Sequence, residues 1–232
     1  MRESSFARYF LTVSVLLFGI SAHIPAVARG RQAQASSQPA APTAAAPSAP
    51  ASAAAATKKP VKPQPRPHST RLAIDPKQID IDDGDTIQIK WGPNDVEEIR
   101  ILGIDCPETR HVQHDIPYSQ IFGEEARAFA RGTFATATKV ELLRASMLDP
   151  YDRTLGYMFV NDKNYSVMVL EARLAEESIT AFGDNGFPQE AAVVLATAKG
   201  AGPLPFEPPY QYRNRMRRVA EWMKGKGIYP TQ

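Results

Sequence analysis

The 232-residue sequence predicts an α+β fold, in which a small β-barrel of five strands carries about three helices. Segments that alternate apolar and polar residues predict the strands, and apolar residues at helical spacing predict the helices. Both patterns are found after residue 70, so the barrel and its helices are expected within residues 71–232. A segment of about 160 residues is large enough for one hydrophobic core.

Five segments have the pattern of strands. Residues 86–90 and 99–104 alternate, and the intervening segment 91–95, Trp-Gly-Pro-Asn-Asp, favours a turn. The two strands therefore form a predicted antiparallel hairpin. The other strands are expected at residues 71–81, 138–144 and 154–160.

Three segments have the pattern of helices: residues 122–137, residues 166–175 with Ser166 as a plausible N-cap, and residues 212–224. Five short strands with a few helices are typical of an OB-fold barrel with appended helices. Residues 183–210 contain five prolines and four glycines, and this composition predicts a long loop.

The first 28 residues have the pattern of a secretory signal peptide. Two arginines precede an apolar run, Tyr9–Ala22, and the small residues Ala26-Val27-Ala28 offer a cleavage site. The alternative is an uncleaved anchor, but a run of about 14 residues is shorter than the ~20 that span a bilayer. We therefore expect a secreted or periplasmic monomer that begins near Arg29, without stable membrane insertion after cleavage.

Residues 29–70 predict a disordered linker, because a segment rich in Ala and Pro has little apolar surface to bury. This linker holds six Lys or Arg and no acid, whereas residues 71–232 hold 19 basic and 24 acidic residues. A basic tether before an acidic domain is not the usual pattern of a tight nucleic-acid-binding protein. The tether fits a spacer; the alternative is that its charge holds a polyanion nearby.

The cysteine and histidine content excludes several kinds of site. A single cysteine, Cys106, excludes an intramolecular disulfide and a cysteine-based zinc site. His111 and His114 lie close together in a polar stretch, where a surface loop is the expected structure.

Acids and arginines occur at the ends of predicted strands. The motif Asp83-Gly84-Asp85-Thr86 precedes one strand of the hairpin, and the segment Arg100–Glu108 begins on the other. If the turn centres near Pro93, residue 85 lies opposite about residue 101, so that Asp85 and Arg100 become neighbours with Asp105 just beyond.

This arrangement has the chemistry of phosphodiester hydrolysis. Asp85 and Asp105 repel each other unless a cation lies between them, and hard oxygen ligands favour calcium over zinc or copper. Arg100 and Arg153 can bind phosphate oxygens with two hydrogen bonds each and stabilise the charge of the transition state. Glu108 is able to orient or deprotonate water.

Four motifs in this order resemble the thermonuclease (staphylococcal-nuclease-like) family, over roughly residues 75–182 and 210–229. The resemblance implies an OB-fold barrel with three helices that hydrolyses single-stranded or loosened DNA and RNA with calcium. The motifs are Asp-Gly-Asp-Thr at 83–86, the segment Arg100–Glu108, Phe-Gly-Glu-Glu-Ala at 122–126, and Tyr-Asp-Arg-Thr-Leu-Gly-Tyr at 151–157.

The resemblance also implies a role for each matching residue. Asp85 and Asp105 would ligate calcium through their carboxylates, and Cys106 through its backbone carbonyl. Cys106 stands where the family often has threonine, a change that a main-chain ligand tolerates. The remaining implied site residues are Glu108 to activate water, Arg100 and Arg153 to bind phosphate, and Tyr151 beside the nucleotide.

Three features depart from the family pattern. Pro150 replaces a common lysine, residues 175–182 contain no tyrosine, and residues 183–210 have no counterpart in the compact members. All five matching acidic and arginine side chains are present, which favours a calcium-dependent nuclease. The resemblance implies that such an enzyme leaves 3′-phosphate ends. One alternative is a non-catalytic OB-fold nucleic-acid-binding module; the net negative charge of the domain counts against the enzyme, because it attracts a nucleic-acid substrate only weakly. Another alternative is an envelope-tethered structural domain with a vestigial site.

Overall fold

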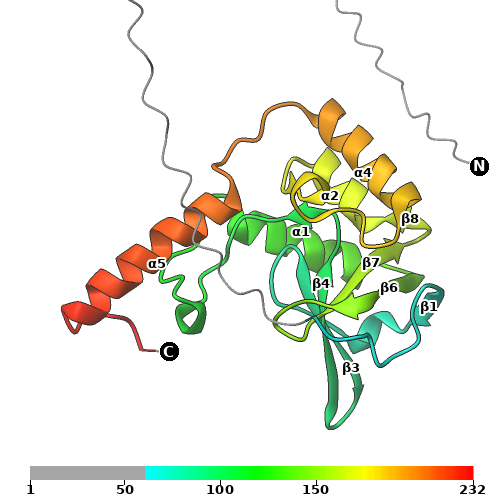
Figure 1. Cartoon of the computed structure of the whole chain (residues 1–232), viewed down its shortest axis with the longest axis horizontal. Helices are drawn as coiled ribbons and strands as arrows, with labels where there is room; N and C mark the ends of the chain where they lie inside the picture. The colour runs from blue at the N-terminus through cyan, green and yellow to red at the C-terminus, as the bar shows by residue number, and fades with distance from the viewer. Residues whose placement is uncertain (1–60, 232) are drawn as a thin grey trace, which may run out of the picture. The chain divides into compact units, whose positions relative to one another are not determined.

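The computed structural model describes residues 61–231, which form an α+β domain built on a curled sheet (Figure 1). The predicted signal peptide and residues 29–60 of the predicted linker lie outside the described residues. No helix within residues 61–231 is long and apolar enough to cross a membrane.

The main sheet has the strand order β1-β6-β7-β4-β3-β2, and a short strand β8 pairs with β7. All neighbouring strands are antiparallel except β4 and β7, which are parallel. The strands are β1 (Arg71–Ile74), β2 (Ile79–Ile81), β3 (Thr86–Gly92), β4 (Asp95–Ile101), β6 (Val140–Leu148), β7 (Thr154–Val160) and β8 (Lys163–Asn164). A separate two-stranded sheet joins β5 (Ile104–Asp105) to β9 (Glu176–Glu177).

The prediction of five strands was too low. The predicted strand 99–104 is divided between β4 and β5, β8 and β9 lie outside the predicted strands, and the segment 71–81 forms two strands rather than one. A 3-10 turn at Pro76–Gln78 interrupts it, and the Asp75 side chain caps that turn by accepting from the Lys77 backbone N–H at 3.0 Å. The interruption lets the two halves pair at opposite edges of the sheet, β1 with β6 and β2 with β3.

The hairpin register follows the sequence prediction. Thr86 pairs with Arg100, and the Ile101 backbone N–H donates to the Asp85 carbonyl at 2.8 Å. Asp85 therefore lies opposite residue 101, and Asp85 and Arg100 are diagonal neighbours across the two strands.

The described residues contain five α-helices, two more than predicted. Helices α1 (Gly123–Ala135), α2 (Tyr165–Glu171) and α5 (Pro209–Gly225) correspond to the predicted ones, although Asn164 rather than Ser166 caps α2, through a hydrogen bond from the Ser166 backbone N–H. In Figure 1, α2 and α4 lie side by side over one end of the sheet, and α5 projects from the opposite side.

The long loop predicted for residues 183–210 was wrong in its central part. Helix α4 (Pro188–Ala201) lies in the middle of that segment, and the short helix α3 (Ile179–Phe182) directly precedes it. Pro188 is the first helical residue, where its missing N–H costs nothing, and Gly202 follows the end. The prolines and glycines therefore delimit the helix rather than disrupt it, and Ala191 and Val194 are buried beneath it.

The linker predicted at residues 29–70 also extends too far. Residues 62–69 run along β6, with backbone hydrogen bonds to Leu148, Ser146 and Arg144 of 2.9 Å each. Gln64 is buried, and its side-chain amide donates to the Thr154 hydroxyl at 2.9 Å. These residues belong to the folded domain because the sheet offers a β6 edge that the composition alone does not reveal.

A buried ion pair crosses the middle of the sheet. Arg144 on β6 donates to both carboxylate oxygens of Glu97 on β4, at 2.8 and 2.7 Å, and these side chains are 2% and 5% exposed. The Thr154 hydroxyl and the Trp91 indole donate to the same carboxylate at 2.7 and 2.8 Å. The charges are therefore fully hydrogen-bonded, which is the condition under which a buried pair is tolerated.

We expect Glu97→Gln to lower the free energy of unfolding by about 3–5 kcal/mol, because it leaves Arg144 buried without a negative partner. Urea denaturation measures this loss. The matched control is Asp80→Asn, which breaks the exposed pair with Lys90 and should cost under about 1 kcal/mol. Equal losses in the two variants would contradict the importance of the buried pair.

The same pair should make stability depend on pH. Burial raises the pKa of Glu97, but hydrogen bonds from Arg144 and Thr154 outweigh it and hold the pKa below its usual value of 4.5. The stability that Glu97 contributes is therefore fully present at pH values above its pKa in the unfolded chain. It is lost as the pH falls through the lower pKa that Glu97 has in the folded protein. The difference between wild type and Glu97→Gln should shrink below about pH 4.

Candidate active site

The turn before β3 is shaped by its own side chains. The Asp83 carboxylate accepts from the backbone N–H groups of Asp85 and Thr86 at 2.9 and 2.7 Å. A Cβ on Gly84 would lie 2.8 Å from the Cys106 sulfur and 2.9 Å from the Ala126 Cβ. The turn is therefore packed directly against the β5 region and helix α1, and only glycine fits there.

The start of α2 holds two loops of the site in place. The buried Tyr165 hydroxyl donates to the Gly84 carbonyl at 2.8 Å, and the buried Ser166 hydroxyl donates to the Leu102 carbonyl at 2.7 Å. One of these carbonyls belongs to the turn before β3 and the other to the turn after β4. Helix α2 therefore fixes the spacing between the two segments that carry Asp85 and Asp105.

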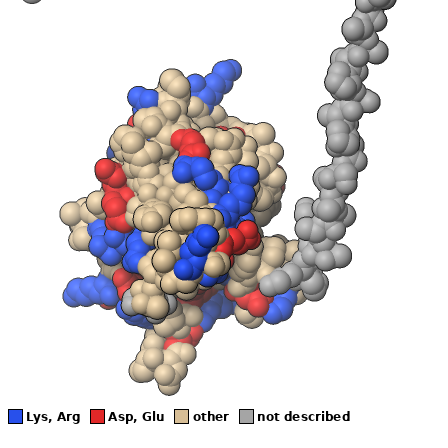
Figure 2. All heavy atoms as spheres, turned by 90° about the vertical axis from the view of Figure 1, so that its left-hand side faces the viewer, with Lys and Arg blue, Asp and Glu red and all other residues tan. Residues whose placement is uncertain are grey.

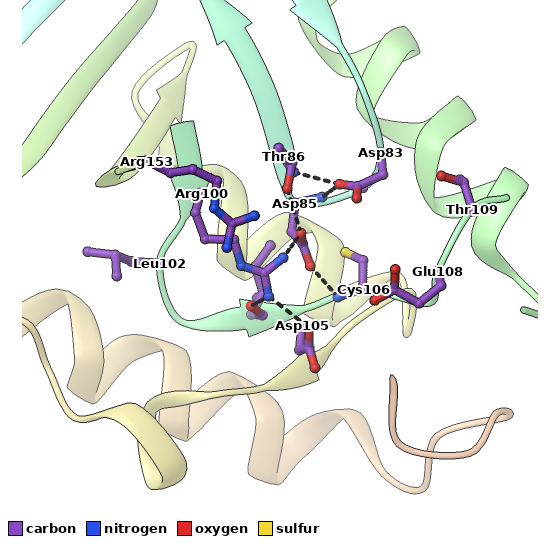
Figure 3. A network of polar contacts seen from close by, with 12 residues as sticks. Asp83, Asp85, Thr86, Arg100, Leu102, Asp105, Cys106, Glu108, Thr109 and Arg153 are labelled. Atoms are coloured by element: carbon purple, nitrogen blue, oxygen red, sulfur yellow. Dashed lines mark hydrogen bonds and ion pairs between the residues drawn. The ribbon is translucent and has the colours of Figure 1, made fainter. Parts of the chain in front are cut away.

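Arg100 joins the two carboxylates (Figure 3). Its guanidinium forms an ion pair with Asp85 and donates to the Asp105 carboxylate at 2.7 Å. Asp85 is 1% exposed and also accepts from the Cys106 backbone N–H at 2.5 Å. The structure therefore brings together four of the predicted residues, Asp85, Arg100, Asp105 and Cys106.

Glu108 is positioned by the start of helix α1. Its carbonyl accepts from the Gln120 backbone N–H at 2.8 Å. A Cβ on Gly123 would lie 2.2 Å from that carbonyl oxygen, so the helix can begin at this place only with glycine. This contact explains the physical role of the Phe-Gly-Glu-Glu-Ala motif.

A second arginine of the site, Arg213 on α5, was missed by the sequence prediction. Its guanidinium donates to both carboxylate oxygens of Asp105, at 3.0 and 2.9 Å, and to Glu108 at 2.5 Å. A signal was present, because Arg213 precedes the buried Met216 and Ala220 by three and seven residues and so borders the apolar stripe.

The pKa values of Asp105 and Glu108, the two acids that contact Arg213, are shifted in opposite directions. Burial raises the pKa of Asp105, but the charges of Arg100 and Arg213 outweigh burial and leave the pKa below its usual 3.8. Burial raises the pKa of Glu108 above its usual 4.5, and the opposing effect of Arg213 is smaller. A carboxylate of raised pKa is a stronger base, which suits a group that takes a proton from water.

Glu176 is a further acid beside the site, also missed by the sequence prediction. It lies opposite Asp105 in the small sheet of β5 and β9. Burial, followed by the charge of Asp105, raises its pKa. Because this pairing joins residues 71 positions apart, no local pattern could indicate it.

Arg153 and Tyr151 lie at the border of the carboxylate cluster rather than within it. Arg100 pairs with Leu155 across the parallel strands β4 and β7, so Arg153, two residues before Leu155, projects on the same face as Arg100. The Arg153 Nε donates to Asp149 at 2.7 Å. Tyr151 is 71% exposed, and its ring centre lies 5.6 Å from the Arg153 guanidinium carbon.

Another group of possible ligands lies nearby. Within the described part of the chain, the donor atoms of Asp82, Asp83 and His111 lie within 4.8 Å of one another, and they form the one set of three or more ligand side chains that does. His111 was expected on a surface loop; it is half-buried, and its Nε2 lies 3.1 Å from Asp82. The hydrogen bond between the two lowers the pKa of Asp82 and raises that of His111.

Asp85, Asp105 and Glu108 do not form so tight a group, because arginine guanidinium groups lie between them. Arg100 separates Asp85 from Asp105, and Arg213 separates Asp105 from Glu108. The oxygen atoms of this set fit a hard divalent cation. Burial also raises the pKa of the Cys106 thiol, so the thiol stays protonated and its backbone carbonyl is the donor suited to such an ion.

A known family model matches the middle part of the described domain. Residues 98–195 match the family model described as Staphylococcal nuclease homologue, a segment that begins on β4 and ends within α4. Over this segment, the match confirms the resemblance to the staphylococcal nuclease family that the motifs predicted.

The chain is also similar to "Endonuclease Htp3" of Saprolegnia parasitica (strain CBS 223.65). The two are 26% identical over 170 residues, which cover 67% of this chain and 73% of the relative. Both matches support a nuclease function for this chain.

We expect Arg213→Gln to lower the free energy of unfolding by about 2–4 kcal/mol in the presence of a chelator. The substitution removes one of the two cations that hold Asp105, which leaves largely buried carboxylates close together without sufficient positive charge. Thermal or urea denaturation measures the loss.

The matched control for this prediction is Arg215→Gln on the same helix. Arg215 pairs with Glu207 at the surface, and its side chain is 52% exposed, so its loss should cost under about 1 kcal/mol. If both variants are as stable as the wild type, Arg213 does not balance the charge of the site.

Proposed function

We propose that this protein is an exported, calcium-dependent nuclease that hydrolyses phosphodiester bonds of single-stranded or loosened DNA and RNA. The observation that supports the proposal most is the joining of two buried carboxylates, Asp85 and Asp105, by the Arg100 guanidinium. Buried acids from two separate segments, with an arginine and a further glutamate beside them, have no role in packing the core. They suit a phosphodiester, its metal ion and a water molecule.

Asp85 and Asp105 would hold the calcium ion through their carboxylates, and Cys106 through its backbone carbonyl. When bound, calcium supplies positive charge that polarises the phosphoryl group and lowers the pKa of water. In the structure, Arg100 and Arg213 supply positive charge to the same carboxylates. The contacts of Arg213 with Asp105 therefore compete with an ion for the same oxygen atoms.

Glu108 would orient the attacking water and accept its proton. Arg213 donates to one of its carboxylate oxygens, and the described residues provide no hydrogen bond to the other. That second oxygen is therefore available to water. The raised pKa of Glu108 increases its strength as a base.

Arg100 and Arg153 would bind the phosphate, and Tyr151 would contact the nucleotide. The two arginines project on one face of β4 and β7, so one phosphate can meet both. Asp149 holds the Nε edge of Arg153 and limits its rotation. The exposed ring of Tyr151, beside Arg153, is a surface on which a base can stack.

We expect cleavage of single-stranded DNA to require calcium, and Asp85→Asn or Asp105→Asn to reduce the rate by at least about a hundredfold. Each substitution removes one negative ligand from the ion. The assay compares excess calcium with excess chelator. The control is Asp162→Asn, because Asp162 lies in the turn between β7 and β8 and its side chain is 71% exposed. Undiminished cleavage in chelator would show that calcium is not required.

Replacement of Arg100 or Arg153 by lysine separates geometry from charge. We expect each variant to fold normally, to bind a nucleotide inhibitor within a few-fold of wild type, and to lose about a hundredfold or more in kcat. The exposed Arg131→Lys on α1 should leave kcat unchanged. A non-catalytic binding module would show no turnover in the wild type and weaker binding in the two site variants.

Export rests on residues 1–28 alone. N-terminal sequencing of the protein from the medium or periplasm should find a chain that begins near Arg29, because Ala26-Val27-Ala28 offers small residues to a signal peptidase. Retention of Met1 would indicate an anchor instead.

A further inference from the structure

The charge of the domain is divided unevenly between α5 and the rest. Residues 209–226 hold six Lys or Arg and one acid, whereas the remainder of residues 71–232 holds 13 basic and 23 acidic residues. A polyanion is therefore repelled by most of the domain and attracted by one helix. This helix is also the one that reaches the site through Arg213.

Two arginines of α5 have no acidic partner among the described residues. Arg215 is paired with Glu207 and Lys224 with Asp115, but Arg217 and Arg218 make hydrogen bonds only to Asn214, at 3.4 Å. Both are exposed. Their charges are therefore available to phosphate groups.

An aromatic side chain accompanies these charges. Trp222 is 58% exposed and lies one helical turn beyond Arg218, so the two are neighbours on the helix surface. An exposed indole gains nothing from the core, but an indole beside cationic side chains is the arrangement on which the bases of a single strand stack. Figure 2, which views the molecule from the side to which α5 projects, shows several Lys and Arg side chains there, with fewer Asp and Glu and with uncharged residues between them.

Helix α5 fixes the position of Arg217, Arg218 and Trp222 relative to the candidate active site. Arg213 contacts Asp105 and Glu108, and Arg217 follows one turn later. At 1.5 Å per residue, Arg217 and Trp222 lie about 6 and 13 Å further along the helix axis than Arg213. A strand of about four nucleotides covers that distance at the 3.4 Å spacing of charges along one strand.

We propose that the outward face of α5, formed by Arg217, Arg218 and Trp222, is a second contact for single-stranded nucleic acid, which holds the strand beyond the bond that is cut. The inference rests on the proposed nuclease function, because that function identifies the bound polyanion as nucleic acid. It assigns to α5 the attraction that the acidic remainder of the domain does not supply.

The test measures binding apart from cleavage. Fluorescence anisotropy of a labelled 12-nucleotide oligothymidylate is recorded with the full chain in chelator, over a range of salt concentrations. For Arg217→Ala/Arg218→Ala we expect about tenfold weaker binding at low salt, and a dependence of log K on log salt that is shallower by about 1.4, since each single-strand phosphate contact contributes ~0.7.

Two further variants isolate charge and stacking. The double substitution Arg131→Ala/Lys199→Ala removes two exposed cations from α1 and α4 and should bind like the wild type. Trp222→Ala should weaken binding about tenfold, and Trp222→Phe should retain it within about threefold, because phenylalanine keeps a stacking surface. Unchanged melting temperatures would establish that all of these variants are folded.

Hydrolysis of a dinucleotide, with calcium present, separates this inference from the proposed function. A dinucleotide has a single phosphate, which lies at the site during cleavage, so none remains for Arg217 or Arg218, and the dinucleotide does not extend over the ~13 Å to Trp222. The variant Arg217→Ala/Arg218→Ala should therefore cleave it at the wild-type rate. If the wild type cleaves nothing but the α5 variants bind the oligonucleotide weakly, the nuclease proposal fails and the α5 contact stands. If the α5 variants and the Arg131/Lys199 variant bind equally well, the α5 contact is overturned.

Discussion

The buried pair of Glu97 and Arg144 holds the sheet in the arrangement on which the site depends. Two charges out of water are stable only when their hydrogen bonds are complete, and here the partners come from β3, β4, β6 and the start of β7. Arg144 also donates to the Pro67 carbonyl at 3.1 Å, so the segment before β1 is held by the same group. The pair is satisfied in one register only, and that register places Arg100 and Arg153 on one face of β4 and β7.

The same physical rule governs the candidate active site. Asp85, Asp105 and Glu108 lie in largely buried positions, and Arg100 and Arg213 balance their charge. The arrangement differs from that of the sheet in one respect: part of it is open to solvent, so an ion and a phosphate can replace arginine contacts. Because one of the two arginines belongs to α5, the helix with the net positive charge is connected directly to the acids.

The family match covers residues 98–195, and α5 lies beyond it. The matched segment contains Arg100, Asp105, Glu108 and Arg153, whereas Asp85 and Arg213 come from the flanking parts of the chain. A complete site therefore requires the fold to bring both flanks to the matched segment. Tyr165 of helix α2 brings the turn before β3 to the matched segment, through its hydrogen bond to that turn. Asp105 brings α5 to it, through its ion pair with Arg213.

The sequence by itself determined the register of the hairpin, three of the helices and the side chains of the motifs, because each depends on residues close together in the chain. The second hairpin strand, expected at residues 99–104, runs from Asp95 to Ile101. The alternation of residues 86–90 and 99–104 and the turn between them were sufficient to place Asp85 opposite residue 101. Only the tertiary structure decided that residues 62–69 join β6, that residues 188–201 form a helix against α2, and that Arg213 and Glu176 meet Asp105. These features depend on partners far away in the sequence, whose burial, charge and open hydrogen-bonding groups exist only once the sheet has formed.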